Sequence, residues 1–486
     1  MPSRIWILWA LFLVRGVFYS AMLPLWEGWD EYAHFAFLQH WSDDGTLPRA
    51  SDPISREIDE SLRLAPLPFE LQWIGPPYLT HEQWWALPAQ ERDDRLRKLA
   101  ALSPAPGHQP AVPINGKPFV FYEAQQPPLF YWIAAAMVKP VAEWPIRERV
   151  LLIRLLSVLL TSLAIPFTFL AARRIHAPSA TWCAALLGVA PGLVIDSARV
   201  ANDGLSIGIA AIFLWLMTSQ KLNWAAAGVT LGAGILAKAS LLVLAPVFIV
   251  IWIRRQWKST LAALTLCLAI GGWWYVRNLI EGMPLTGWQE SAPLGAVAKA
   301  AIALFHNGGW INEAYTIAKS FTWFGAWSFL TLRTWMYVAL EVCALGGMLV
   351  GIARYRATLR VPIAVTACFA IAITGGAAAY YAVHQVAGIP GWYLWPAGGA
   401  MAILIASGLG RWSVIFAAML ALTDIYGVTA RMMPYYAGLA PRLHGSLTQL
   451  PEASMRLLVP IWLIALWIAA TLAIPALAYG RAKTRT

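Results

Sequence analysis

The sequence predicts an all-α polytopic membrane protein, and three observations lead to that class. Of the 486 residues, 59% are hydrophobic and only 13% are charged, a balance outside the range of soluble domains. The mean hydropathy of +0.57 agrees with this. Apolar windows of spanning length recur along the whole chain, and charged residues are segregated between alternate connections. The net charge of +11 therefore reflects membrane topology, and nucleic acid is not an expected partner.

The first window follows Arg4 and is too long for a cleaved signal peptide, so we expect an uncleaved anchor. About twelve windows reach spanning length. They lie at 4–25, 150–172, 178–195, 204–219, 222–238, 239–254, 258–280, 331–353, 360–383, 390–409, 411–427 and 456–479.

A thirteenth apolar stretch at 129–141 is shorter than the roughly 20 residues that a spanning helix needs. If it does not span, one set of alternate connections carries basic residues and no acid: Arg4, Arg173, Arg174, Lys221, Arg254, Arg255, Lys258, Arg354, Arg356, Arg360, Arg411, Arg481, Lys483 and Arg485. That face is predicted to be cytoplasmic, with both termini. The stretch is then an interfacial helix on the outer face of a bacterial inner or plasma membrane.

Two modules follow from this topology. Residues 1–290 form a transmembrane module with a long extracytoplasmic loop at 26–149, which holds a predicted amphipathic surface helix at 89–102. Residues 291–486 form a second module with outer loops at about 291–330 and 428–455. The four cysteines lie in apolar stretches, so their positions indicate neither a disulfide framework nor a metal site.

The adjacent acids Asp30 and Glu31 mark the point where the first span leaves the membrane, with His34 one helical turn later. A partly desolvated carboxylate at this boundary can accept a proton from a hydroxyl group. A helix cap or a solvated loop charge explains either acid equally well.

A second polar group, Arg199, Asn202 and Asp203 after Asp196, precedes the window at 204–219 on the same predicted face. An ordinary N-cap accounts for the Asn-Asp pair. A functional site is favoured because this polar group and Asp30 are predicted to lie at the same level of the membrane.

Lys238 and Arg277 end two further windows at that level, where they suit a phosphate group. Snorkelling is the competing explanation. Glu123 and Gln126, beside a Pro-Pro pair, could line a sugar-sized pocket or simply begin a helix. Arg15 and Glu341, inside predicted spans, must pair or face a cavity.

In this order, the segments "WDEYAHF", "QQPPLFYW", "RVANDGL", "GAGILAKAS" and "GWWYVRNL" resemble the GT-C superfamily of membrane glycosyltransferases. The resemblance is to the branch of the protein O-mannosyltransferases and the lipid A aminoarabinose transferase, and it covers residues 1 to 290 best. Two departures concern substrate: Gln126 stands where a His is common in the mannosyltransferases, and Trp392 replaces an arginine.

The resemblance implies a GT-C-type bundle that uses a sugar on a polyprenyl phosphate at the outer face, with a lipid, glycan or protein as acceptor. Asp30 would be the base of an inverting transfer. Glu31, His34, Glu123, Gln126, Arg199, Asn202 and Asp203 would orient the substrates, and Lys238 and Arg277 would hold the phosphate.

No metal ligand set is predicted, and a divalent cation is left open as a cofactor. Three other functions remain as alternatives. A transporter of a small solute or lipid-linked glycan should show repeats and broken helices near the midplane. An O-antigen ligase or polymerase would need Arg and His in a large late loop, where 428–455 offers Arg431, Arg442 and His444. The third is a non-catalytic scaffold.

Overall fold

The computed structural model describes residues 3–102, 120–177, 180–287 and 292–479. Arg481, Lys483 and Arg485 of the predicted cytoplasmic face lie outside these ranges. In the described part, seven helices are long and apolar enough to cross a membrane, or up to eight if one bent pair counts as a single span. The protein is thus a helical, multi-pass membrane protein, as predicted.

Each predicted window contains a helix, but several are shorter than a membrane is thick, so the number of about twelve stays a prediction. The helices of the first module are α1 (Ser3–Met22), α7 (Ile146–Ser162), α8 (Ala164–Arg174), α9 (Ala180–Val189), α10 (Pro191–Ser197), α11 (Asp203–Met217), α12 (Trp224–Ala237), α13 (Leu244–Trp252), α14 (Trp257–Cys267) and α15 (Trp273–Ile280).

The second module begins with a hairpin of α16 and α17 and continues as a set of longer helices. Its elements are α16 (Leu294–His306), α17 (Gly309–Thr322), α18 (Thr334–Tyr355), α19 (Arg360–His384), the 3-10 helix η6 (Gly391–Ala397), α20 (Gly398–Leu409), α21 (Ser413–Gly427), α22 (Met433–Tyr436), α23 (Leu450–Arg456) and α24 (Ile461–Tyr479).

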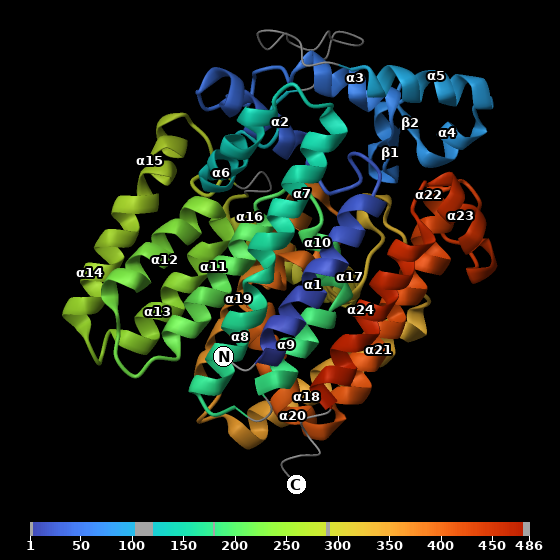
Figure 1. Cartoon of the computed structure of the whole chain (residues 1–486). Helices are drawn as coiled ribbons and strands as arrows, with labels where there is room; N and C mark the ends of the chain where they lie inside the picture. Colours follow the sequence, from blue (N-terminus) through green and yellow to red (C-terminus); the bar gives the residue numbers. More distant parts are fainter. Residues whose placement is uncertain (1–2, 103–119, 178–179, 288–291, 480–486) are drawn as a thin grey trace.

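The long first loop folds into a cap over one end of the bundle, where α22 and α23 also lie (Figure 1). Its elements are α2 (Glu31–Asp44), α3 (Arg56–Leu64), β1 (Pro66–Leu67), β2 (Leu79–Thr80), α4 (His81–Ala86), α5 (Ala89–Ala100) and α6 (Leu129–Val138). The two strands pair in parallel. Helix α6 has only ten residues, too few to span, and it packs against α2 within the cap.

Buried charge pairs join this cap to α7. Arg154 on α7 binds Glu31, and Arg149 on α7 binds Glu57 of α3; all four side chains are almost completely inaccessible. Inside the bundle, Arg15 binds Asp424 at 2.8 Å, and Thr322 donates a hydrogen bond to Glu341. Both mid-span charges are therefore paired or hydrogen-bonded, as the sequence predicts.

Helix α17 has two close backbone neighbours on one of its faces. A methyl group on Gly192 of α10 would come within 2.0 Å of the Phe321 carbonyl oxygen, and one on Gly391 of η6 within 1.9 Å of the Ile317 oxygen. The chain bends by 58° between α9 and α10, where Pro191 begins a new helix. This bend brings α10 against α17.

Candidate functional site

Asp30 lies on the wall of a cleft of about 960 Å³ between the cap and the second module. The first loop supplies Trp29, Asp30, Tyr32, Glu70 and Tyr122 to this wall. The opposite wall comes from the segments 316–337, 380–393 and 442–443. The cleft therefore unites the first loop with segments of the last third of the chain, at the end of the bundle that the cap covers.

Asp30 is the N-cap residue of α2, but its side chain makes no capping hydrogen bond. Its backbone is left-handed, with φ of 49°, a conformation that non-glycine residues seldom adopt and that often marks functional sites. The helix-cap explanation for this acid therefore does not describe its side chain. A carboxylate on a cleft wall is in a position to meet a substrate.

Glu31, its neighbour, has a different environment. Arg154 donates to both carboxylate oxygens, from Nε at 2.8 Å and Nη2 at 2.5 Å, and the backbone N–H of Val200 donates at 2.9 Å. Glu31 is completely buried. The structure thus differs from the expectation that Glu31 touches substrate, because its oxygens are already bound. It fixes the first residues of α2 against α7 and the 199–203 turn.

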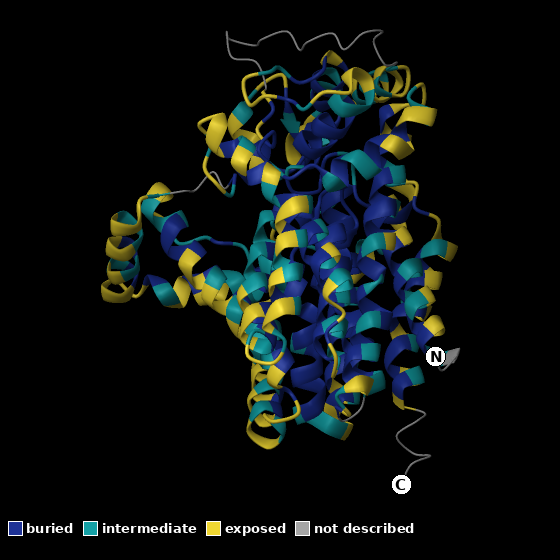
Figure 2. Ribbon diagram, turned by 90° about the vertical axis from the view of Figure 1, so that its left-hand side faces the viewer, coloured by how far each residue is buried: buried dark blue, intermediate teal, exposed yellow. Residues whose placement is uncertain are grey.

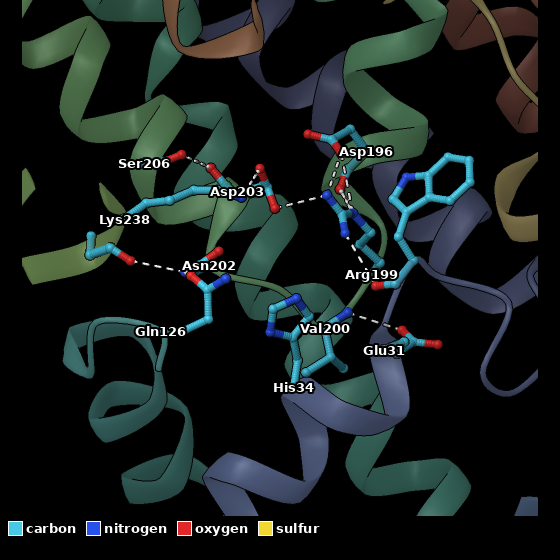
Figure 3. Close-up of polar contacts among 12 residues, drawn as sticks. Glu31, His34, Gln126, Asp196, Arg199, Val200, Asn202, Asp203, Ser206 and Lys238 are labelled. Carbon is cyan, nitrogen blue, oxygen red and sulfur yellow. Dashed lines mark hydrogen bonds and ion pairs between the residues drawn. The ribbon is translucent and has the colours of Figure 1, made fainter. Parts of the chain in front are cut away.

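The 199–203 turn carries a buried network of charges (Figure 3). Arg199 donates to Asp196 at 2.7 Å, to Asp203 at 2.8 Å and to the Trp29 carbonyl at 3.2 Å. Lys238, at the end of α12, binds the other oxygen of Asp203 at 2.6 Å. Two acids and two cations therefore form one chain of ion pairs.

Asn202, the N-cap residue of α11, also makes no side-chain cap. Its amide instead donates to Gln126 Oε1 and to the Ala237 carbonyl, both at 3.1 Å. The predicted Asn-Asp pair thus connects the first loop with α12, and Figure 3 shows His34 and Gln126 facing this turn.

Several of the predicted site residues act on one another electrostatically. Although burial works against it, the carboxylates of Asp196 and Asp203 hold the pKa of Arg199 above its ordinary value, and Asp30 adds to their effect. Burial, followed by the charges of Arg199 and Lys238, lowers the pKa of His34 well below its ordinary value. His34 is therefore neutral at pH 7, and its Nδ1 lies 2.7 Å from the Tyr131 hydroxyl.

Two tyrosines on the cleft wall respond to Asp30 and Glu123. Burial raises the pKa of the Tyr32 and Tyr122 hydroxyls, and both carboxylates raise it further. These phenols therefore stay protonated and are hydrogen-bond donors near Asp30. The predicted residue Glu123 is buried close to them.

Arg277 is the predicted site residue whose recorded contacts lie along its own helix, α15. Its guanidinium binds Glu281 at 2.8 Å and lies 4.4 Å from the centre of the Trp274 ring. Helix α15 is at the edge of the bundle (Figure 1). The Arg277 Nη1 atom is buried and has no hydrogen-bond partner in the described part of the chain.

Sequence reasoning missed Arg154 and the cleft-wall residues Glu70, Lys319 and Tyr393, and it named Arg442 only for the ligase alternative. A cation within the apolar window at 150–172 was the available signal for Arg154, since such a charge needs a partner. Glu70 lines the cleft as a second acid beside Asp30, and burial raises the pKa of its carboxyl group. Within the described ranges, no group of three His, Cys, Asp or Glu side chains has an arrangement that could hold a metal ion.

The fold and the site define a multi-pass membrane protein with a cleft at one end of its bundle that is lined by charges of both signs. No family model matches the sequence, and no curated protein matches it. The structure is similar to that of ArnT from Cupriavidus metallidurans bound to undecaprenyl phosphate, with a TM-score of 0.47 and 13% identity over 99% of this chain and 77% of that chain. The structure of ArnT from the same organism in the apo state has a TM-score of 0.40 and 15% identity, over 73% of this chain and 66% of that chain.

Proposed function

We propose that this protein is an integral membrane glycosyltransferase that moves a sugar from a polyprenyl phosphate to an acceptor at the extracytoplasmic face. The observation that carries the proposal is the position of Asp30, on a cleft wall beside protonated tyrosines and near a chain of buried ion pairs. The five motifs that resemble the GT-C superfamily support it, since four of them contribute residues to this arrangement.

In the proposed reaction, the acceptor oxygen attacks the anomeric carbon as the bond to the donor phosphate breaks. Asp30 accepts the acceptor proton, and the polyprenyl phosphate leaves with the bonding electron pair. One base suffices, because a phosphate leaving group needs cations rather than an acid. Attack opposite the leaving group inverts the anomeric centre.

The other residues hold this geometry. Glu31, through Arg154, positions the start of α2, and Asp203 binds and positions Lys238. Lys238 lies 5.5 Å from the centre of the Tyr393 ring, which lines the cleft. Lys238 and Arg277 remain the cations proposed for the phosphate, with Arg277 Nη1 as an unused donor. Lys319 and Arg442, on the cleft wall, join them in the proposal.

The test is transfer from a labelled polyprenyl-phosphate sugar to a lipid extract of the source membrane by purified protein in liposomes. Asp30→Asn should lower turnover by about 10²- to 10⁴-fold, the usual contribution of a general base. Asp44→Asn is the matched control, because Asp44 lies at the far end of α2 and its side chain is 40% exposed. Turnover near the wild-type value in a folded Asp30→Asn protein would remove Asp30 from the role.

One observation favours transport as a second candidate. The bend between α9 and α10 is a broken helix of the kind that transporters use to form a binding site. The same liposomes distinguish the two functions. A transporter would move the labelled lipid-linked sugar between leaflets without forming a product, whereas a transferase forms the product.

A further inference from the structure

A second cavity, of about 530 Å³, lies between the turn that joins α16 to α17 and the end of α19. Six polar side chains line it: Asn307, Asn312, Tyr315, Thr316, Tyr381 and Gln385. The rest of its lining is glycine or small and apolar, and none of the residues that line it is charged. The volume falls in the usual range of small-molecule sites, roughly 300 to 1,000 Å³.

This neutral pocket shares two walls with the cleft that holds Asp30. On α17, Thr316 lines both cavities, and Lys319, one turn later, lines only the cleft. On α19, Tyr381 and Gln385 line the pocket, whereas the adjacent Tyr380 and His384 line the cleft. A ligand that occupied both cavities would therefore pass along α17 from an uncharged environment to a charged one.

Some polar side chains of the pocket hold their neighbours in position, and others can form hydrogen bonds with a ligand. Asn307 donates to the Tyr381 hydroxyl at 3.0 Å and accepts from the Gly309 N–H at 2.9 Å, so it fixes the position of Tyr381. The amide of Asn312 makes no hydrogen bond to any described residue, and its side chain is exposed to the pocket.

Gln385 is held at the mouth of the pocket by an uncommon backbone. It ends α19 in the left-handed region, with φ of 59°, and its Nε2 donates to the carbonyls of Tyr381 and Ala382, both at 3.2 Å. Because the amide nitrogen is used by the helix end, the Oε1 atom is directed to other donors. An acceptor oxygen, a free amide and tyrosine hydroxyls are thus grouped without a charge.

That grouping selects the chemistry of a ligand. A phosphate or a carboxylate would need a cation, and the pocket lining supplies none. Amides and hydroxyls bind ligands that carry many hydroxyl groups, and the face of Tyr381 can pack on the C–H face of a sugar ring. One face of Tyr315 is already occupied by the Lys319 ammonium, 5.1 Å from the ring centre. The surroundings fit an uncharged carbohydrate.

We propose that this pocket binds a neutral glycan, and that this glycan belongs to the acceptor. The assignment to the acceptor rests on the proposed function, because the donor must place its phosphate among the cleft cations. The preference for a neutral carbohydrate rests on the pocket alone.

Saturation-transfer NMR on the purified full chain tests the binding. The probes are glucose, galactose, mannose, N-acetylglucosamine, lactose and maltose. At least one should receive saturation from the protein, and Asn312→Ala should weaken its binding about fivefold, the effect of one lost neutral hydrogen bond. Gln385→Gly should do the same, while glycine suits the positive φ and leaves the backbone unstrained.

Thr374→Ala is the control, since Thr374 is an exposed α19 residue that does not line the pocket. The proposal is overturned if no probe receives saturation, or if binding is unchanged in both pocket variants. Failure of the catalytic proposal looks different: Asp30→Asn would then transfer sugar normally. Loss of transfer in Asp30→Asn, with probe binding intact, is the result expected if both proposals hold.

Discussion

The cap and helix α17 line the same cleft from opposite walls but are attached to the bundle by different interactions. The cap is held by buried ion pairs, Glu31 with Arg154 and Glu57 with Arg149. Helix α17 is held by backbone N–H groups of 388–391, which donate to Glu313 and Ser320, and by close contacts at two glycines.

The outer surfaces of the two regions differ as well. Helix α16 projects from the bundle, at the left of Figure 2, and exposes apolar side chains such as Leu294 (88%) and Phe305 (76%). Helix α5 of the cap has exposed charges that pair along the helix. The wall that carries the proposed base is thus held by ion pairs, whereas the opposite wall is held by backbone hydrogen bonds to Glu313 and Ser320 and by close contacts at glycines.

The largest effect is expected from Arg154→Met, which removes the partner of buried Glu31. An uncompensated buried charge typically costs about 3 to 5 kcal/mol, so the free energy of unfolding should fall by that amount. Unfolding of the purified protein in mixed micelles measures it. Adding Glu31→Gln should recover part of the loss, because the second change removes the unpaired charge. No recovery would mean that lost packing, not charge, is responsible.

Gly192→Ala should come next, because the new methyl group would meet the Phe321 carbonyl and push α17 away from α10. Overpacking of this kind costs about 1 to 3 kcal/mol. Gly375→Ala on α19 is the matched control, with open space where its methyl group would lie. Alanine there should be neutral or should stabilise the helix by up to about 1 kcal/mol. Equal effects at both sites would contradict the close contact.

The pH dependence of stability should depend on His34 in the cap. Because its pKa is lower in the folded protein, the unfolded chain takes up a proton first as the pH falls. The stability that neutral His34 contributes is therefore complete above the ordinary pKa of about 6.5 and is lost as the pH falls below it, by at most about 1.4 kcal/mol per pH unit. Unfolding of wild type and His34→Asn between pH 7 and pH 5 checks this. If the stability of the wild type and of His34→Asn falls with the same slope as the pH is lowered, another group is responsible for the loss.

The smallest effect is expected from Phe305→Ser on the exposed face of α16. A surface position usually changes the free energy of unfolding by no more than about 0.5 kcal/mol. The same unfolding measurement applies. A loss as large as that of Gly192→Ala would show that α16 is held by its side chains, and would end the distinction between the two walls.

The sequence predicted the features that local signals determine. Apolar windows and charge segregation indicated a helical membrane protein and a non-spanning helix at 129–141, and α6 has the expected short length. The sequence also predicted that the first-loop acids and the Asn-Asp turn face each other across one cleft. The turn does contact the first loop, through Asn202 with Gln126 and Arg199 with Trp29, but neither Asn202 nor Asp203 lines the cleft that holds Asp30. The membrane orientation, the two-module division and the residue roles stay predictions.

The remaining features depend on contacts between distant segments, which spacing does not encode. Nothing near Glu31 in the sequence shows that Arg154 will occupy both its oxygens. In the same way, the pairing of Arg277 with Glu281 competes with its predicted role and depends on how α15 packs. Lys319, Tyr393 and Arg442 reach the cleft only because the second module folds back against the cap.

Two glycines that approach α17 have a consequence for the cleft. Gly192 and Gly391 meet the Phe321 and Ile317 carbonyls, four residues apart on one face of the helix, so α17 has no free space on that face. A ligand that needs a wider cleft would therefore have to gain that width from the first-loop wall, the side that carries Asp30. Admission of substrate and placement of the proposed base would then be a single movement.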